Sequence, residues 1–154
     1  MDIVDLRLIE NKDGGDCVLN GNDLEMISGF QNMPYIGMFG GNVEQSTLGP
    51  KTTEETFDFW GNFLFHPTEQ PIWFNSKTEL LLKSVALTSS GRIQIQEQVK
   101  KDISFMELFS QITVSVSLIT VDKVQISIKI QEPNNLQSTD LIYIWDATQQ
   151  ELTQ

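Results

Sequence analysis

Residues 112–130 read ITVSVSLITVDKVQISIKI, and this stretch decides the fold. Its two halves, 112–118 and 124–130, alternate strictly between branched apolar residues and polar ones. Such alternation is typical of a strand with one buried face, because successive side chains of a strand point to opposite sides. Asp122-Lys123 lies between the halves and can form a turn. The stretch therefore predicts an antiparallel hairpin with one face in the core.

The residues before this hairpin have a helical period. Apolar residues spaced by four, four and three positions form one helical stripe: Ile95, Val99, Ile103 and Met106. The opposite face is polar, so we expect a surface helix that is packed by one side. Further upstream, residues 76–79 fit a capping box that opens a second helix, whose apolar residues lie within 80–85.

The flanks supply more extended structure. Residues 141–145 read LIYIW and predict a third strand. Near the start, residues 2–9 alternate and turn signals follow at 13–16 and 20–23, which predicts an N-terminal β-hairpin. The segment 24–75 has no clear period. Its apolar residues suit a short helix or an irregular packed segment, and Pro34 conflicts with a helix there.

The order of these elements predicts an α+β fold. We expect an N-terminal β-hairpin and two central helices packed on a C-terminal antiparallel sheet of about three strands. At 154 residues, the length favours a single domain over residues 1–154.

Composition restricts the function. Hydrophobic residues make up 40% and charged residues 20%, as in a globular domain, and 10 basic against 21 acidic residues give a net charge of −11. This charge disfavours binding to nucleic acid or to an anionic membrane, both of which attract basic surfaces. The first residues do not resemble a signal peptide, and no apolar run reaches the roughly 20 residues of a membrane helix. We therefore expect synthesis in the cytoplasm.

Few residues suggest chemistry. His66 and Cys17 are the only histidine and cysteine, and neither has a partner that would indicate a triad, a metal site or a redox motif. Two acid pairs, Glu54-Glu55 and Glu97 with Asp102, would suit a glycosidase only in apolar surroundings, and we expect both to face solvent. The sequence thus predicts no catalytic residue, no cofactor and no metal site.

Two features remain as candidates for binding. Arg92 opens the long helix, where the helix dipole disfavours a positive charge, so its side chain serves a partner carboxylate or a backbone carbonyl, or it is simply solvated. An aromatic cluster spans residues 57–74 and includes Trp60 and Trp73. This cluster is typical of a core or an interface. An alternative is a small module that binds carbohydrate or peptide through these two tryptophans.

Several short motifs resemble the baseplate proteins of Mu-like phages. The start of the chain carries Asp5-Leu6-Arg7-Leu8, Gly14-Gly15-Asp16-Cys17-Val18-Leu19 and Gly21-Asn22-Asp23-Leu24, and Phe59-Trp60-Gly61-Asn62 follows in the middle. The likeness extends over most of the chain, and the order of the motifs carries it.

The segment 84–106 resembles the wider lysozyme-like wedge family, related to the small wedge protein of T-even phages. A small-residue break and Gly91-Arg92 precede the long helix there. In that family a Gly-Glu-Arg motif opens the helix, and the missing acid in Gly91-Arg92 weakens the transfer of that motif's contacts. The label "lysozyme-like" brings no enzyme with it.

The resemblance implies a non-enzymatic structural protein of the virion, in the inner baseplate of a contractile phage tail or a related injection system. Its expected partners are other wedge proteins, the tail sheath and the proteins of the tube base or hub, with about six copies in a closed ring. The expected role is to join the wedge to the tube base and to template the first sheath ring during tail assembly.

Strand addition is the mechanism that the sequence offers for this role. Strands at 112–130 and 141–145 would present backbone groups at a sheet edge, which a neighbouring chain extends. Exposed aromatic residues would anchor a partner helix, because large rings contribute much interface energy at low entropy cost. The predicted interface residues are Trp60, Arg92, Ile128, Ile142 and Trp145.

Overall fold

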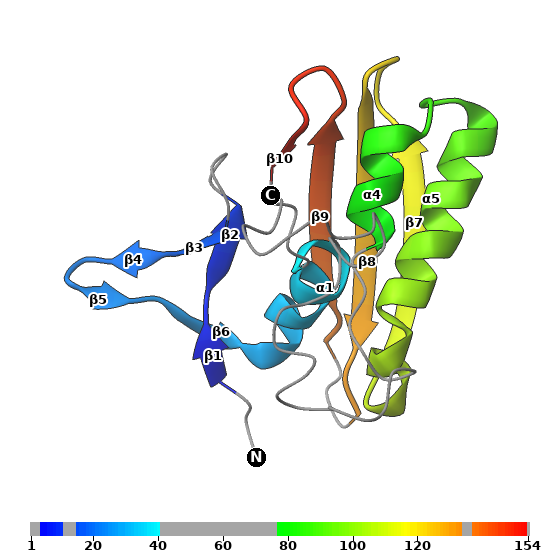
Figure 1. The fold of residues 1–154 in the computed structure, drawn as a ribbon. Helices are drawn as coiled ribbons and strands as arrows, with labels where there is room; N and C mark the ends of the chain where they lie inside the picture. The colour runs from blue at the N-terminus through cyan, green and yellow to red at the C-terminus, as the bar shows by residue number, and fades with distance from the viewer. Residues whose placement is uncertain (1–3, 11–14, 41–76, 134–136, 154) are drawn as a thin grey trace, which may run out of the picture.

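The computed structural model of the chain describes residues 4–10, 15–40, 77–133 and 137–153, and these residues form an α+β fold (Figure 1). Their helices are α1 (Gly29–Phe39), α4 (Lys77–Ser84), α5 (Ser89–Asp102) and the short 3-10 helix η2 (Ser104–Leu108). The expected α+β class, the N-terminal hairpin and the central helices on a C-terminal sheet are confirmed.

The C-terminal sheet has four antiparallel strands in the order β10-β9-β8-β7. They are β7 (Gln111–Leu118), β8 (Lys123–Gln131), β9 (Thr139–Asp146) and β10 (Glu151–Thr153). Val114 of β7 lies opposite Ile128 of β8, which lies opposite Leu141 of β9. The expected count of about three strands is one too low, because the three residues of β10 are too few for an alternating pattern.

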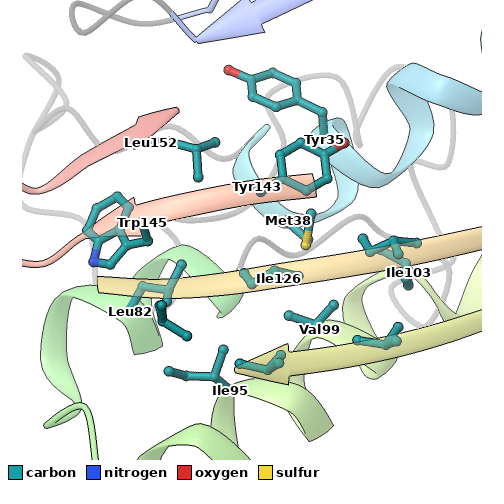
Figure 2. Packing of buried hydrophobic residues seen from close by; sticks show 14 of the residues in the cluster. Tyr35, Met38, Leu82, Ile95, Val99, Ile103, Ile126, Tyr143, Trp145 and Leu152 are labelled. Carbon is teal, nitrogen blue, oxygen red and sulfur yellow. The ribbon is translucent and has the colours of Figure 1, made fainter. Parts of the chain in front are cut away.

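The core lies between one face of this sheet and the helices α1, α4 and α5 (Figure 2). The predicted helical stripe is confirmed, since Ile95, Val99 and Met106 are 0% exposed and Ile103 is 1% exposed. Every inward residue of β8 is buried as well: Val124, Ile126, Ile128 and Ile130. Burying a branched side chain stabilises a fold by about 1.5–3 kcal/mol, so this contact is the main source of stability among the described elements.

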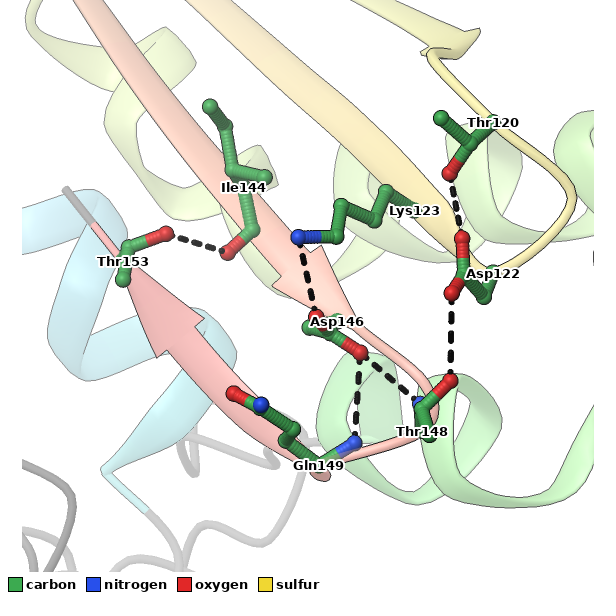
Figure 3. A network of polar contacts seen from close by, with 8 residues as sticks. All are labelled: Thr120, Asp122, Lys123, Ile144, Asp146, Thr148, Gln149 and Thr153. Carbon is green, nitrogen blue, oxygen red and sulfur yellow. Dashed lines mark hydrogen bonds and ion pairs between the residues drawn. The ribbon is translucent and has the colours of Figure 1, made fainter.

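The turns at one end of the sheet are tied together by polar contacts (Figure 3). Thr148 of the β9–β10 turn donates to Asp122 of the β7–β8 turn at 3.2 Å, and Lys123 pairs with Asp146 at 3.1 Å. Hydrogen bonding by Thr120 lowers the pKa of Asp122, and hydrogen bonding by Lys123 lowers the pKa of Asp146. This end of the sheet is therefore closed by the chain's own side chains.

The N-terminal hairpin is built from three short antiparallel ribbons. The strand β1 (Val4–Leu6) pairs with β6 (Met26–Ser28), β2 (Leu8–Glu10) with β3 (Gly15–Cys17), and β4 (Leu19–Asn20) with β5 (Asp23–Leu24). In Figure 1 the β4–β5 ribbon projects away from the rest of the protein. Its turn needs Gly21, whose φ of +67° lies in the left-handed region that glycine favours.

The three ribbons meet at a closed ring of backbone hydrogen bonds. The N–H of Arg7 donates to the carbonyl of Glu25 at 2.8 Å, Glu25 donates to Val18 at 2.8 Å, and Val18 donates to Arg7 at 3.1 Å. The Arg7 guanidinium also pairs with the Glu25 carboxylate at 2.9 Å. The backbone N–H and carbonyl groups of the three junction residues thus bond to one another, and these bonds fix the geometry of the branch point.

Helix α1 occupies part of the segment that has no clear period in the sequence. It continues through Pro34, which lies inside the helix and is buried. A proline there removes one hydrogen-bond donor, so tertiary contacts must compensate. They are present: Met38 is 0% exposed, and Phe39 stacks near Tyr143 of β9 with ring centroids 6.2 Å apart. Packing against the sheet therefore overrides the local preference of the sequence.

Candidate protein-interaction surfaces

The start of α5 is the first of the predicted regions, and it is built for close packing. Thr88 caps the helix, because its hydroxyl oxygen accepts from the Gly91 N–H at 3.1 Å. Gly91 is buried against the preceding turn. A Cβ at this position would lie 2.1 Å from the Ala86 carbonyl oxygen, which is closer than any side chain can approach. Glycine at 91 is thus required by space.

Arg92 binds a backbone carbonyl within its own chain. Its Nη1 donates to the carbonyl oxygen of Val116 on β7 at 3.1 Å. One helical turn later, the Gln96 side-chain oxygen accepts from the N–H of Val116 at 3.3 Å. Sequence reasoning missed Gln96, although its spacing of four from Arg92 places both side chains on one helix face. Together they occupy both outward backbone groups of Val116.

This contact divides the edge strand β7 into two halves. Residues of an antiparallel strand alternate between facing their partner and facing away, so Ile112, Val114 and Leu118 share the outward direction of Val116. A groove of about 140 Å³ runs beside the first half and is lined by Lys100, Ile103, Glu107, Ile112 and Val114. The edge is therefore covered by side chains at Val116 and bordered by a groove at Ile112 and Val114.

The opposite edge of the sheet, formed by β9 and β10, is also incomplete at the end where Ile112 and Val114 lie. β10 pairs only with residues 144–146 of β9, so residues 139–143 have no strand on that side within the described part of the chain. The register places Ile112 opposite Ile130, and Ile130 opposite Thr139. Both half-edges that the described residues leave unpaired thus lie at the same end of the sheet, opposite the turns that Asp122 and Asp146 tie together.

Two of the predicted interface residues are buried in the described fold. Ile128 is 1% exposed and belongs to β8, an inner strand, and Trp145 is 3% exposed in the core. Both side chains face the core, and the register places Ile128 between β7 and β9. Ile142 is 50% exposed on the polar face of β9, within the uncovered half. The predicted residue Trp60, with Trp73 and His66, lies outside the described residues.

Asp102 differs from the expected solvent-facing acid. Its carboxylate accepts from the Thr78 N–H and hydroxyl, both at 2.7 Å, and from Gln98 at 2.8 Å, so it caps the first turn of α4. Burial raises the pKa of Asp102 to about 6, and the hydrogen bonds from Thr78 only partly oppose this rise. Glu97 does face solvent and pairs with Lys100 at 2.9 Å. The raised pKa accompanies a structural contact between two helices.

The Asp102 carboxyl predicts a pH-dependent stability. Its folded pKa of about 6 lies above the ordinary 3.8, so the folded state holds the proton more tightly. The stabilisation is complete below the ordinary pKa and is lost as pH rises through the folded one. We expect the difference in unfolding free energy between wild type and Asp102→Asn to fall by about 1.4 kcal/mol from about pH 5 to about pH 7.5.

Urea unfolding at a series of pH values measures this difference. Glu97→Gln removes an exposed carboxylate from the same helix and controls for the loss of one negative charge. A difference that stays constant, or that grows with pH, would contradict the assignment.

The described residues were also examined for metal-ligand clusters and for membrane-spanning helices. No group of three or more His, Cys, Asp or Glu side chains in the described ranges is placed to hold a metal ion. None of the described helices has the length and apolar character needed to cross a membrane. Comparison of the chain with protein-family models, curated proteins and solved structures finds no match.

Proposed function

We propose that this chain is a structural subunit of a contractile-tail baseplate. In this role it joins the inner wedge to the tube base and templates the first sheath ring, with about six copies in the ring. The order of the sequence motifs along the chain supports the assignment to a baseplate. The observation that carries the mechanism is the pair of half-edges at one end of the sheet to which no described strand is paired.

The half-edges suit strand addition. An incoming extended segment would bond to the outward N–H and carbonyl groups of Ile112 and Val114, as in other complexes built by β-augmentation. The groove beside these residues places apolar surface next to a positive Lys100 and a negative Glu107. Arg92 and Gln96 limit the addition to this half, because they already occupy the backbone of Val116. The chain thus selects where a partner strand begins.

Co-expression with the products of the neighbouring genes tests this proposal. We expect a hetero-oligomer that contains sheath, tube-base or wedge proteins. A chain that stays monomeric in the presence of all of them would rule the proposal out.

A pair of proline variants tests the strand-addition mechanism. Ile112→Pro removes an outward N–H from the uncovered half of β7, and Leu118→Pro removes an outward N–H beyond Val116. Neither change breaks a bond to β8, because both residues face away from it. We expect Ile112→Pro to weaken hetero-oligomer formation at least about tenfold and Leu118→Pro to leave it within about twofold.

Circular dichroism spectra and thermal melting show whether both variants are folded. If the two variants melt alike and assemble equally well, strand addition at this edge is refuted. If Ile112→Pro alone unfolds, Ile112→Lys takes its place, since an edge lysine opposes strand pairing while keeping the backbone N–H.

A further inference from the structure

The N-terminal ribbons carry an apolar stripe. In the register of β1 with β6 and of β4 with β5, Leu6 lies opposite Met26 and Leu19 lies opposite Leu24. Opposed residues share a face, and so do residues two apart on one strand. Val4, Leu6 and Met26 therefore share one face of the β1–β6 ribbon, and Leu19 and Leu24 share one face of the adjoining β4–β5 ribbon. We call this set the ribbon stripe.

Most of the ribbon stripe is open to solvent. Val4 is 59% exposed, Leu19 69%, Leu24 41% and Met26 55%. Single exposed apolar residues are normal on a protein surface, whereas several gathered on two small adjoining ribbons mark a candidate interaction site. A two-stranded ribbon is also marginally stable by itself, so a surface that covers the stripe would stabilise it.

The opposite face of the ribbons contacts the body through Asp5. Asp5 alternates with Val4 and Leu6, and its carboxylate accepts from the amide of Asn32 on α1 at 3.0 Å. Ile27 lies opposite Asp5 and shares this face. Glu25 alternates with Leu24 and Met26, and it pairs with Arg7 at the junction. The contact with α1 therefore holds the ribbons in place, while Val4, Leu19, Leu24 and Met26 stay exposed.

Charge decides between the possible occupants of the stripe. The chain has a net charge of −11, and Asp23 is an exposed acidic residue next to Leu24 on the ribbons. A second copy would bring the same negative charge to the contact, which opposes self-association. A different protein with basic residues around an apolar strip would gain attraction at the rim and burial at the centre.

We propose that the ribbon stripe is the docking surface for a second, basic protein of the assembly. This inference rests on the proposed function, because it assigns a partner-binding face to the same subunit. The partner covers Val4, Leu19, Leu24 and Met26 with apolar side chains and places lysine or arginine near Asp23, beside Leu24. This surface is distinct from the sheet edge at Ile112, so one subunit contacts two neighbours at once.

A photo-crosslinking amino acid tests the surface in the intact chain. It is placed at Leu19 in cells that make the whole assembly, and at Ile93 of α5 as a control, since Ile93 is 53% exposed on the body. We expect a crosslink from position 19, and not from 93, to another protein that mass spectrometry identifies and whose contact peptide is rich in lysine or arginine. A crosslink only within this chain, to a second copy, or to nothing would overturn the inference.

Binding of the captured protein, once purified, gives the quantitative test. We expect Leu19→Ser with Met26→Ser to raise the dissociation constant at least about tenfold, and raised salt to weaken binding as well. The matched control, Ile93→Ser with Val121→Ser, removes two exposed apolar side chains from the body and should change it less than about twofold. Equal effects of the two pairs would also overturn the inference. If the captured protein is not a tail protein, the docking surface stands and the baseplate role fails.

Discussion

Gly91→Ala is expected to lower the free energy of unfolding by about 3 kcal/mol or more, although alanine is the better helix former. In an open helix the change would stabilise by up to about 1 kcal/mol. Here the new Cβ would lie 2.1 Å from the Ala86 carbonyl oxygen, so the backbone of the turn must move. That oxygen also accepts from the Thr88 N–H at 2.8 Å, and Thr88 caps α5. The clash therefore disturbs the cap as well.

Thermal melting measures the Gly91→Ala effect. For a chain of this length the expected loss corresponds to a fall in melting temperature of about 6–12 °C. Ser90→Ala is the matched control, because Ser90 precedes Gly91 in the same helical turn and is exposed. We expect the control to stay within about 0.5 kcal/mol of wild type. A Gly91→Ala protein that melts like the control would show that the turn accommodates a methyl group.

The parts of the fold that were predictable are those in which one residue pattern repeats. Ile95, Val99 and Ile103 mark the buried face of α5 because only one helix face meets the sheet. The alternation through Val114 and Ile126 marks β7 and β8 for the same reason. Periodicity reports how many sides of an element are buried, and both elements have one buried side.

What the pattern does not contain is the neighbour of each element. Ile128 and Val116 belong to equally regular strands, but one lies in an inner strand and the other in an edge strand. Helix α1 was uncertain because Pro34 opposes it, and only its packing against the sheet decides the outcome. Short elements such as β10 have too few residues to show a period. Strand order and tertiary compensation thus come from the structure.

For the candidate surfaces, too, the sequence indicates some residues, and only the structure shows what they contact. Arg92 was singled out because its charge opposes the helix dipole, and the structure supplies its acceptor, the Val116 carbonyl. The ribbon stripe was not foreseen, although Val4, Leu19 and Met26 are plainly apolar. The pairing register places them on two adjoining ribbons, and their exposed fractions show that they are open to solvent.

Asn32→Asp is expected to lower the free energy of unfolding by about 2–4 kcal/mol at neutral pH. Asn32 is 2% exposed, and its amide group donates to the Asp5 carboxylate at 3.0 Å and to the Leu6 carbonyl. Its oxygen accepts from the Leu8 N–H at 3.3 Å. Aspartate has nearly the same shape, but it loses both donated bonds and faces Asp5 with a like charge.

The exchanged pair, Asp5→Asn with Asn32→Asp, separates charge from shape. It restores a donor opposite the new carboxylate, so we expect it to recover at least about half of the lost stability. Urea unfolding measures the total loss of unfolding free energy. Amide hydrogen exchange shows where stability is lost, and we expect protection to fall first at residues 5–8 and 24–28. A single variant as stable as wild type, or an exchanged pair no better than the single, would contradict this account. Because Asn32 ties Asp5 and the backbone of Leu6 and Leu8 to α1, it also fixes the orientation of the ribbons that carry the ribbon stripe. Asn32→Asp should therefore weaken partner binding while leaving every residue of the stripe unchanged.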